Sequence, residues 1–487
     1  MTGIGRLAAL VSAAALARCD LAPHYQPPNF VVPASYQGAG PWQVAHPADQ
    51  IPHGAWWTAY GNSTLDDLES RIPENPNLLA EQQAFTQARD LAAEAESGLY
   101  PQVGLNSALS QNKQSVHRLF RSPTSAAPLV EPSVQVDAAA SWEIDLWDRI
   151  GNEAKARKQL AQAEAATVES VRLSLQAELA NAYITLRGLD QQAKVYRQTS
   201  ATYQTALNIT QARLADKIGN ILDVERAQTQ LGSARALLED NAAQRAVAQH
   251  AIAVLVGQSP SSFSLPPQQD TPLNLPRVPT GLPSELLQRR PDIAAAERAM
   301  AAANAEIGVS RAAFYPNVSL SGLAGMQDAG FNLVSLPNAV WSIGSAIALP
   351  LFEGGLRRAE LDFAKSAYQQ TRDNYRSVIL TAFQQVEDQL SLNDHLAKEA
   401  AADQQALSAS QKAQTLSMQL YQAGVGNFLD VVVAQVAAFQ VETGQVGIDI
   451  RVQQASVNLV RALGGGWDAS LLPMERATLP FDPLVPG

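Results

Sequence analysis

The sequence contains one structural unit written twice, and this repeat restricts the possible folds more than any other feature. Two matches carry it. A proline is followed 25 residues later by a Tyr-Pro pair, at Pro76 to Pro101 and again at Pro291 to Pro316. A Gly-Asn-x-Leu-Asp-Val motif lies 38 residues before a further glycine, from Gly219 to Gly257 and from Gly426 to Gly464. Two independent matches with equal internal spacing predict a tandem repeat.

Each unit has one segment that favours an exceptionally long helix. Residues 152–216 contain no proline and only one glycine, and residues 356–423 contain neither. Ala, Gln, Glu, Leu and Arg dominate both, and these are strong helix formers. At 1.5 Å per residue, such a helix is roughly 100 Å long. A second helix follows in each unit, at 221–256 and 427–463, and a shorter one precedes the Tyr-Pro pair.

Between the short helix and the long one, each unit has a pattern typical of paired strands. Residues 132–147 alternate between apolar and polar side chains almost without exception. The same alternation is present at 339–351, and the partner strands are expected at about 99–115 and 315–327. Each chain therefore has four strands of 12–15 residues, with one apolar and one polar face.

Four strands per chain cannot close a barrel alone, and lipid does not tolerate open sheet edges. The strands are therefore expected to be completed by other copies of the chain, with lipid outside and water inside. After the first twenty residues we find no apolar run near the ~20 residues of a membrane-spanning helix. A soluble β-sandwich with coiled-coil arms would give similar strand patterns and remains an alternative.

Composition and motifs exclude several classes of function. The net charge is −11, with only 17% charged residues, whereas a nucleic-acid partner normally needs a basic face. The sequence has no nucleophile-elbow motif, phosphate-binding loop or credible carboxylate pair, so we expect no enzyme and no cofactor. One cysteine and scattered histidines predict no metal site.

The N-terminus is typical of an exported lipoprotein. Residues 1–18 have a short start with Arg6 and then an apolar stretch, which predicts a signal peptide. The lone Cys19 directly follows and is the predicted lipidation site. Arg18 departs from the small residue expected before such a cysteine, so an ordinary cleaved signal is the alternative. Asp20 leaves the sorting of the lipoprotein open.

These residues also carry a family resemblance. The repeat unit, the run Gly281–Ile293 and the start Cys19–Tyr25 together resemble the outer-membrane factor (TolC/OprM) family, and within it the NodT-type efflux lipoproteins. The resemblance covers essentially the whole mature chain. It implies a mixed α/β membrane protein: a homotrimer with a twelve-stranded transmembrane β-barrel, continued by a periplasmic tunnel of coiled-coil α-helices.

The resulting domain organisation has six parts, of which two are the repeats and three form an equatorial belt in the family. In chain order they are a signal peptide (1–18), an extended equatorial segment (19–60), the first repeat (61–258), a proline-rich connector (259–285), the second repeat (286–465) and a C-terminal equatorial tail (466–487).

The resemblance also implies specific sites at the end of the helices far from the strands. In the family this end closes at rest, with aspartates at the constriction; the matching residues are Asp430, its counterpart Asp223, and Tyr421. Three copies of Asp430 around an axis would favour cations. Alternatively, both aspartates simply favour a helix N-terminus. Val433 replaces a second acid found in some relatives. The helix-tip turns expected to contact an adaptor contain Gly219, Asn220, Leu222, Gly426, Asn427 and Leu429.

The implied function is that of a passive outer-membrane exit duct in a tripartite efflux system. It would export drugs or other small toxic compounds from an inner-membrane RND pump, through a periplasmic membrane fusion adaptor. The other expected partners are outer-membrane lipids. Two other functions remain open: the channel of a type I protein secretion system, and a coiled-coil surface protein that forms no channel.

Overall fold

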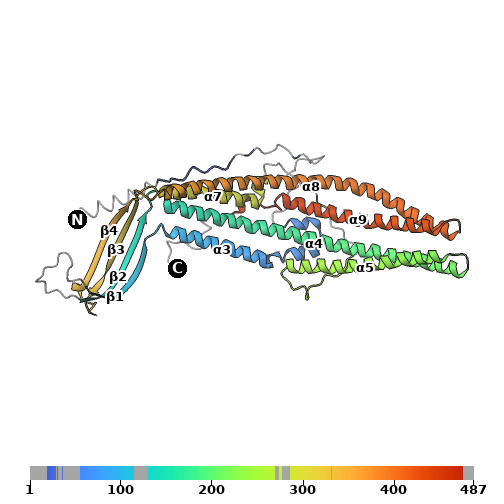
Figure 1. The fold of residues 1–487 in the computed structure, drawn as a ribbon, viewed down its shortest axis with the longest axis horizontal. Coiled ribbons are helices and arrows are strands. Elements are labelled where there is room, and N and C mark those ends of the chain that lie inside the picture. The colour runs from blue at the N-terminus through green and yellow to red at the C-terminus, as the bar shows by residue number, and fades with distance from the viewer. Residues whose placement is uncertain are drawn as a thin grey trace.

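The computed structural model describes residues 19–28, 30, 36, 55–113, 130–268, 274–276, 286–330 and 332–474. The molecule is long and narrow, with a β-sheet at one end and two helix tips at the other (Figure 1). The predicted signal peptide lies outside the described residues. The same holds for most of the equatorial segment, parts of the connector and the tail after residue 474.

The two halves of the chain have the same order of elements with equal helix lengths. In each half a helix of 22 residues is followed by two strands, a helix of 67 residues and a helix of 35. The first half contains α3 (Pro76–Ser97), β1 (Gln102–Lys113), β2 (Val130–Ile144), α4 (Arg149–Ala215) and α5 (Ile221–Leu255). The second contains α7 (Pro291–Ala312), β3 (Asn317–Asp328), β4 (Ala339–Ala348), α8 (Leu356–Gln422) and α9 (Phe428–Ala462).

Short elements pack beside the helices of the bundle. They are η2 (Trp56–Tyr60), α2 (Ser63–Glu69), η3 (Ile72–Glu74), α6 (Leu286–Arg289) and η6 (Ala469–Leu471). A further one, η5 (Leu336–Asn338), lies between β3 and β4.

The observed bounds differ from the predicted ones by a few residues, for identifiable reasons. Helix α4 begins at Arg149 instead of residue 152, because the Asp145 carboxylate accepts hydrogen bonds from the Ile150 and Gly151 amides, at 3.2 and 2.8 Å. Strand β1 begins at Gln102 instead of residue 99, because Leu99 and Tyr100 still complete a turn of α3. Side-chain caps and turn geometry of this kind are hard to derive from periodicity.

The helices form a bundle in which the shorter ones share the length of the longer ones. α3 and α5 follow each other along α4, and α9 and α7 do the same along α8 (Figure 1). α4 also packs against α7 and α9, so it joins the two halves. Gly188, midway along α4, permits the contact with α9, because a Cβ there would lie 2.2 Å from Cδ1 of Ile450.

The four strands form one antiparallel sheet in the order β1-β2-β3-β4, with β1 and β4 at its edges. The register aligns Val103, Ala140, Gly322 and Ile343 across the sheet, so their side chains share a face. That face is apolar apart from Ser107, Ser345 and three polar residues at the strand ends, Gln111, Lys113 and Asp328, whereas the opposite face carries most of the other polar residues. The apolar side chains on the face of Val103 and Ile343 include Leu105, Leu109, Val136, Trp142, Leu320, Met326, Trp341 and Ile347.

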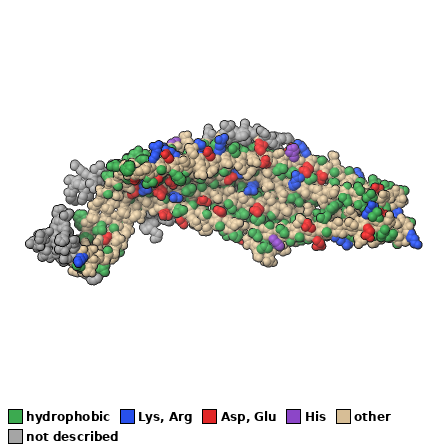
Figure 2. All heavy atoms as spheres, in the orientation of Figure 1, with side chains coloured by type: hydrophobic (Ala, Val, Ile, Leu, Met, Phe, Trp, Pro, Cys, Tyr) green, Lys and Arg blue, Asp and Glu red, His purple; other side chains and the backbone are tan. Residues whose placement is uncertain are grey.

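The main hydrophobic core lies midway along the bundle. There η2 and α2 place Trp56, Tyr60 and Leu65 against α4 and α9. On the face drawn in Figure 2, acidic and basic side chains are spread along the helices, and few lie on the sheet. Only α9, among the helices described, is long and apolar enough to cross a membrane, with a mean hydropathy of 1.2 over 18 residues. The sequence did not predict this apolar segment; α9 packs along α8 and α4, and 28% of the segment is buried.

Candidate functional site: the two helix tips

Each helix pair ends in a turn of the same geometry at the far end of the bundle (Figure 1). The Ile218 amide donates to the Arg213 carbonyl at 3.0 Å, and the Val425 amide donates to the Leu420 carbonyl at 3.1 Å. These are the six-residue bonds of a Schellman motif, which ends a helix with one left-handed residue. That residue is Lys217 in the first turn (φ +64°) and Gly424 in the second (φ +77°).

The two residues of the repeated Gly-Asn pair have different roles, which are the same in both turns: the glycine is required sterically, and the asparagine forms a hydrogen bond. A Cβ on Gly219 would lie 2.8 Å from the Leu214 amide nitrogen, and one on Gly426 would lie 2.9 Å from that of Tyr421. The asparagine then caps the following helix. Asn220 accepts from the Leu222 amide at 3.0 Å, and Asn427 accepts from the Leu429 amide at 2.7 Å. The motif therefore fixes a tight turn and starts the next helix.

Behind the turns, one hydrophobic cluster joins the two helix pairs. It contains Tyr203, Ala206 and Leu207 of α4; Val224, Ala227, Leu231 and Ala234 of α5; Tyr421 of α8; and Phe428 and Val431 of α9. The two tips are thereby held together within a single chain.

Tyr421 lies at the centre of this contact. Its ring packs on Phe428, with 5.2 Å between ring centroids, and the Arg213 guanidinium lies 4.8 Å from its centroid. Arg213 Nη1 also donates to the Tyr421 carbonyl at 3.1 Å. Burial, together with the Asp223 carboxylate, raises the pKa of the Tyr421 hydroxyl, and Arg213 opposes that shift. The hydroxyl is therefore neutral at physiological pH.

The two aspartates of the repeated motif have different surroundings. Asp223 is half-buried, lies 3.7 Å from Arg226 Nη1 and acts on Tyr421. Asp430 is exposed. The structure thus brings together Tyr421 and Asp223, and no interaction of the Asp430 side chain with either of them is found among the described residues. Sequence reasoning missed Arg213 and Phe428, since neither belongs to the part of the motif that is identical in the two halves.

The outer surface of both turns carries exposed aliphatic side chains. Ile218 is 66% exposed and its counterpart Val425 is 77% exposed. Leu222 and Leu429, which were predicted to contact an adaptor, are also exposed. Monomeric soluble proteins rarely group large apolar residues at an exposed end, and such groups typically mark interaction sites.

Cys19 lies far from the tips, where the sheet meets the helices. Its amide donates to the Leu146 carbonyl just after β2, at 3.0 Å, and the residue is exposed. The following residues run along α7 and α4. Asp20 Oδ1 accepts from Asn152 at 2.9 Å, and Arg311 Nη1 donates to the Leu21 carbonyl at 3.1 Å. The predicted lipidation site is thus held at the junction of sheet and bundle.

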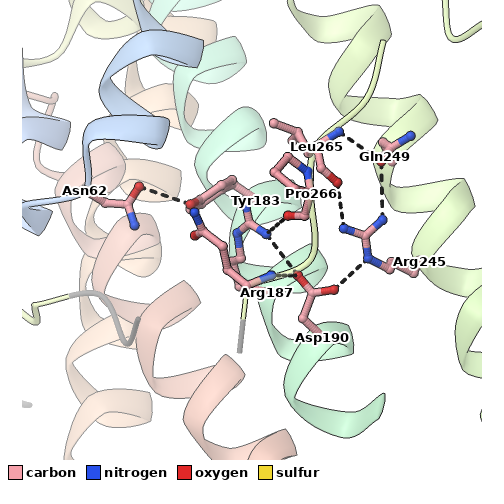
Figure 3. Close-up of polar contacts among 9 residues, drawn as sticks. Asn62, Tyr183, Arg187, Asp190, Arg245, Gln249, Leu265 and Pro266 are labelled. Atoms are coloured by element: carbon pink, nitrogen blue, oxygen red, sulfur yellow. Dashed lines mark hydrogen bonds and ion pairs between the residues drawn. The ribbon is translucent and has the colours of Figure 1, made fainter. Parts of the chain in front are cut away.

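A buried ionic network ties the connector to the first half (Figure 3). Asp190 is 2% exposed and accepts from Arg187 Nη1 at 2.9 Å and from Arg245 Nε at 2.6 Å. The same two arginines donate to the Pro266 and Leu265 carbonyls, at 2.9 and 2.8 Å. Sequence reasoning missed this network, because its members are spread over α4, α5 and the connector. Within the described ranges, no three His, Cys, Asp or Glu side chains are grouped to bind a metal.

Comparison with known proteins agrees with this arrangement. The sequence matches the family model "Outer membrane efflux protein" over residues 69–258 and again over 282–465. It is 32% identical to the outer membrane protein OprJ of Pseudomonas aeruginosa, over 95% of this chain and 96% of that protein. It is 30% identical to the cation efflux system protein CusC of Escherichia coli, over 93% and 97%.

The fold is similar to that of the outer-membrane channel OprN, with a TM-score of 0.86 and 26% identity, over 92% of this chain and 100% of that one. The chain belongs to the outer membrane efflux protein family, and the resemblance inferred from the sequence is confirmed. It is an efflux protein of the outer membrane. The family comprises efflux proteins and is not a family of enzymes.

Proposed function

We propose that three copies of this chain form a passive exit duct, with a twelve-stranded barrel in the outer membrane and a helical tunnel in the periplasm. The observation that carries the proposal is the open four-stranded sheet. Among the described residues, its edge strands β1 and β4 each pair on one side only and leave the other edge open. Its apolar face exposes large side chains, including Trp341 at 75% and Ile343 at 83%. Lipid requires both a closed sheet and an apolar exterior.

The long helix of the second half supports the same assembly. α8 packs mainly against α7 and α9, and Phe363, Leu380 and Leu416 are exposed on it. A trimer places another copy beside each α8, and so removes these side chains from water.

The test is the mass of the protein extracted in mild detergent from separated membranes. We expect three times the mature chain, recovered from the outer-membrane fraction. A monomer that dissolves without detergent would leave the sheet edges unpaired and would overturn the duct.

We further propose that Cys19 is lipidated and anchors the duct beside the barrel. The hydrogen bond from the Cys19 amide to Leu146 supports this, because it holds the residue where the strands enter the bundle. Asp20 and Arg311 fix the segment that follows. Mass spectrometry of the mature N-terminus should find a lipid on Cys19, absent in Cys19→Ser; an unmodified thiol would refute the anchor.

At the periplasmic end, we propose that Tyr421, Asp223 and Asp430 form the aperture. Tyr421 and Asp223 belong to the contact that joins the two tips, so they govern closure. Asp430 is exposed and would act on permeating ions by its charge. Conductance in planar bilayers should become less cation-selective in Asp430→Asn and change little in the exposed control Glu225→Gln. Equal selectivity of the wild type and Asp430→Asn would remove Asp430 from the aperture.

The duct has partners at both ends of the pathway. We propose that the exposed tip residues contact a periplasmic membrane fusion adaptor, which connects the duct to an inner-membrane RND pump. The pump supplies the energy, and the exported compounds are drugs or other small toxic molecules. Deletion of the gene should increase susceptibility to such compounds. Loss of a secreted protein without any change in susceptibility would instead favour a type I secretion channel.

A further inference from the structure

The two tips share their backbone geometry but differ in the residue at the left-handed position. Gly424 in the second tip is the residue that this conformation normally selects, because it has no Cβ to approach the next carbonyl oxygen. In the first tip the position is occupied by Lys217. Non-glycine residues with positive φ are uncommon and concentrate at functional sites.

Nothing within the first tip accounts for a lysine there. Its side chain is exposed, and no carboxylate of the described chain forms an ion pair with it. The lysine also contributes nothing to the cluster that joins the tips. A cation kept in a disfavoured conformation without an internal partner points to a partner outside the chain.

The surroundings of Lys217 indicate what that partner is. The exposed Ile218 follows it and the exposed Asp216 precedes it, so the first turn presents both charged and apolar side chains to solvent. In the second tip, residues 423–427 carry no charged side chain, and the exposed Val425 takes the place of Ile218. α4 has 67 residues, which separates Lys217 from the sheet by about 100 Å, so membrane lipid lies out of reach.

We propose that Lys217 forms an ion pair with a carboxylate on the periplasmic adaptor, while Ile218 and Val425 make the apolar contacts common to both tips. The inference rests on the proposed adaptor contact and deepens it. Because Gly424 offers no cation, the adaptor's acidic residue distinguishes the first tip from the second. A charge pair at an interface chiefly determines specificity and register, so it can make the adaptor distinguish the first tip from the second.

A zero-length carbodiimide cross-link in intact cells tests the ion pair directly. The reagent activates a carboxylate, the Lys217 amine displaces the activated oxygen, and an amide forms with net loss of water. Mass spectrometry should find Lys217 joined to an Asp or Glu of a periplasmic adaptor. The exposed Lys412, within α8, is the control and should carry no such link.

A second probe separates this inference from the proposed function. An Ile218→Cys variant carrying a thiol-linked photo-cross-linker reports any adaptor at the tip, whatever its charge. Adaptor cross-links at both positions support the ion pair. A link at residue 218 without one at Lys217 overturns the ion pair alone, and no adaptor at either position overturns the adaptor contact as well.

Binding should follow the charge. We expect Lys217→Gln to retain about two- to fivefold less adaptor on co-purification, the range of a single exposed ion pair. Lys217→Glu should lose more, because it places like charges together, whereas Lys412→Gln should bind as the wild type does. Equal recovery of the adaptor with Lys217→Glu and the wild type would overturn the inference.

Discussion

Helices α4 and α8 occupy equivalent places in the two halves and have 67 residues each, yet their surroundings differ. α4 buries 28 of its residues and α8 buries eight. α4 packs along helices of both halves, whereas α8 packs mainly against α7 and α9 of its own half. Equal length and equal position in the repeat therefore do not give equal packing. The long helix of the first half is covered largely within the chain, whereas that of the second half leaves most of its length exposed.

The same contrast appears in the charges along these helices. Asp190 of α4 is buried between Arg187 and Arg245. At the position equivalent to Arg187, α8 carries Asp394, which is partly exposed and paired with the exposed Lys398 one turn on. The repeat thus preserves backbone structure while each half adapts its ionic side chains to burial or to solvent.

The largest effect is expected from removing the buried carboxylate. Asp190→Ala would leave two guanidinium groups buried without their counter-ion, and should lower the free energy of unfolding by about 3–5 kcal/mol. Loss of helical circular dichroism on heating measures it. Asp394→Ala is the matched control and should leave the melting temperature unchanged, because exposed pairs contribute little. Equal effects at both sites would contradict the contrast between α4 and α8.

The second effect concerns the tips. Tyr421→Ala removes a buried ring that packs on Phe428 and Arg213, and should cost about 3 kcal/mol. It should also raise single-channel conductance, because the two tips lose their common contact. Tyr421→Phe should behave as the wild type, since the hydroxyl has no hydrogen-bond partner among the described residues. Leu214, the half-buried counterpart of Tyr421, gives the control Leu214→Ala, with a smaller effect on conductance.

A buried acid without a partner provides the third test. Glu69 at the end of α2 is 1% exposed, and neither carboxylate oxygen accepts a hydrogen bond within the described structure. Burial, and then Asp66, raises the pKa of this carboxyl well above 4.5. The folded state therefore holds the proton more tightly than the unfolded state does. The contribution of the protonated Glu69 carboxyl to the free energy of unfolding is therefore fully present below about pH 4.5. It is lost as the pH rises through the raised pKa.

Glu69→Gln should then stabilise the protein by about 1–3 kcal/mol at pH 8, because it removes the cost of an unpaired buried carboxylate. At pH 4.5 the gain should vanish. Thermal unfolding at both pH values measures the difference, with the exposed Glu74→Gln as control. If Glu69→Gln raised the free energy of unfolding equally at both pH values, Glu69 would be ionised in the folded protein. It would then be a buried carboxylate without a counter-ion, in contrast to Asp190, which has two.

Sequence reasoning located the elements well and their environments poorly. The proline-free runs and the alternating strands identified the helices and the sheet, because periodicity reports which face is apolar. The turn motif located both tips. Arg213 behind Tyr421, the Arg187–Asp190–Arg245 network and the buried Glu69 were all missed. Each depends on residues from separate elements that meet only after the bundle is packed, and local patterns carry no such information.

The smallest effect tests the difference between the two turns most directly. Lys217→Gly should raise the free energy of unfolding by about 0.5–1 kcal/mol, since relief of the left-handed strain exceeds the entropy that glycine gains in the unfolded chain. Gly424→Lys should lower it by a similar amount. At that position no atom lies within 4 Å of an added Cβ, so the change isolates the backbone conformation.

If Lys217→Gly gives no gain in the free energy of unfolding, the first turn holds its lysine without strain, and the presence of the lysine needs no partner to explain it. If the variant is more stable yet binds the adaptor less well, the chain has exchanged stability for recognition at one tip only.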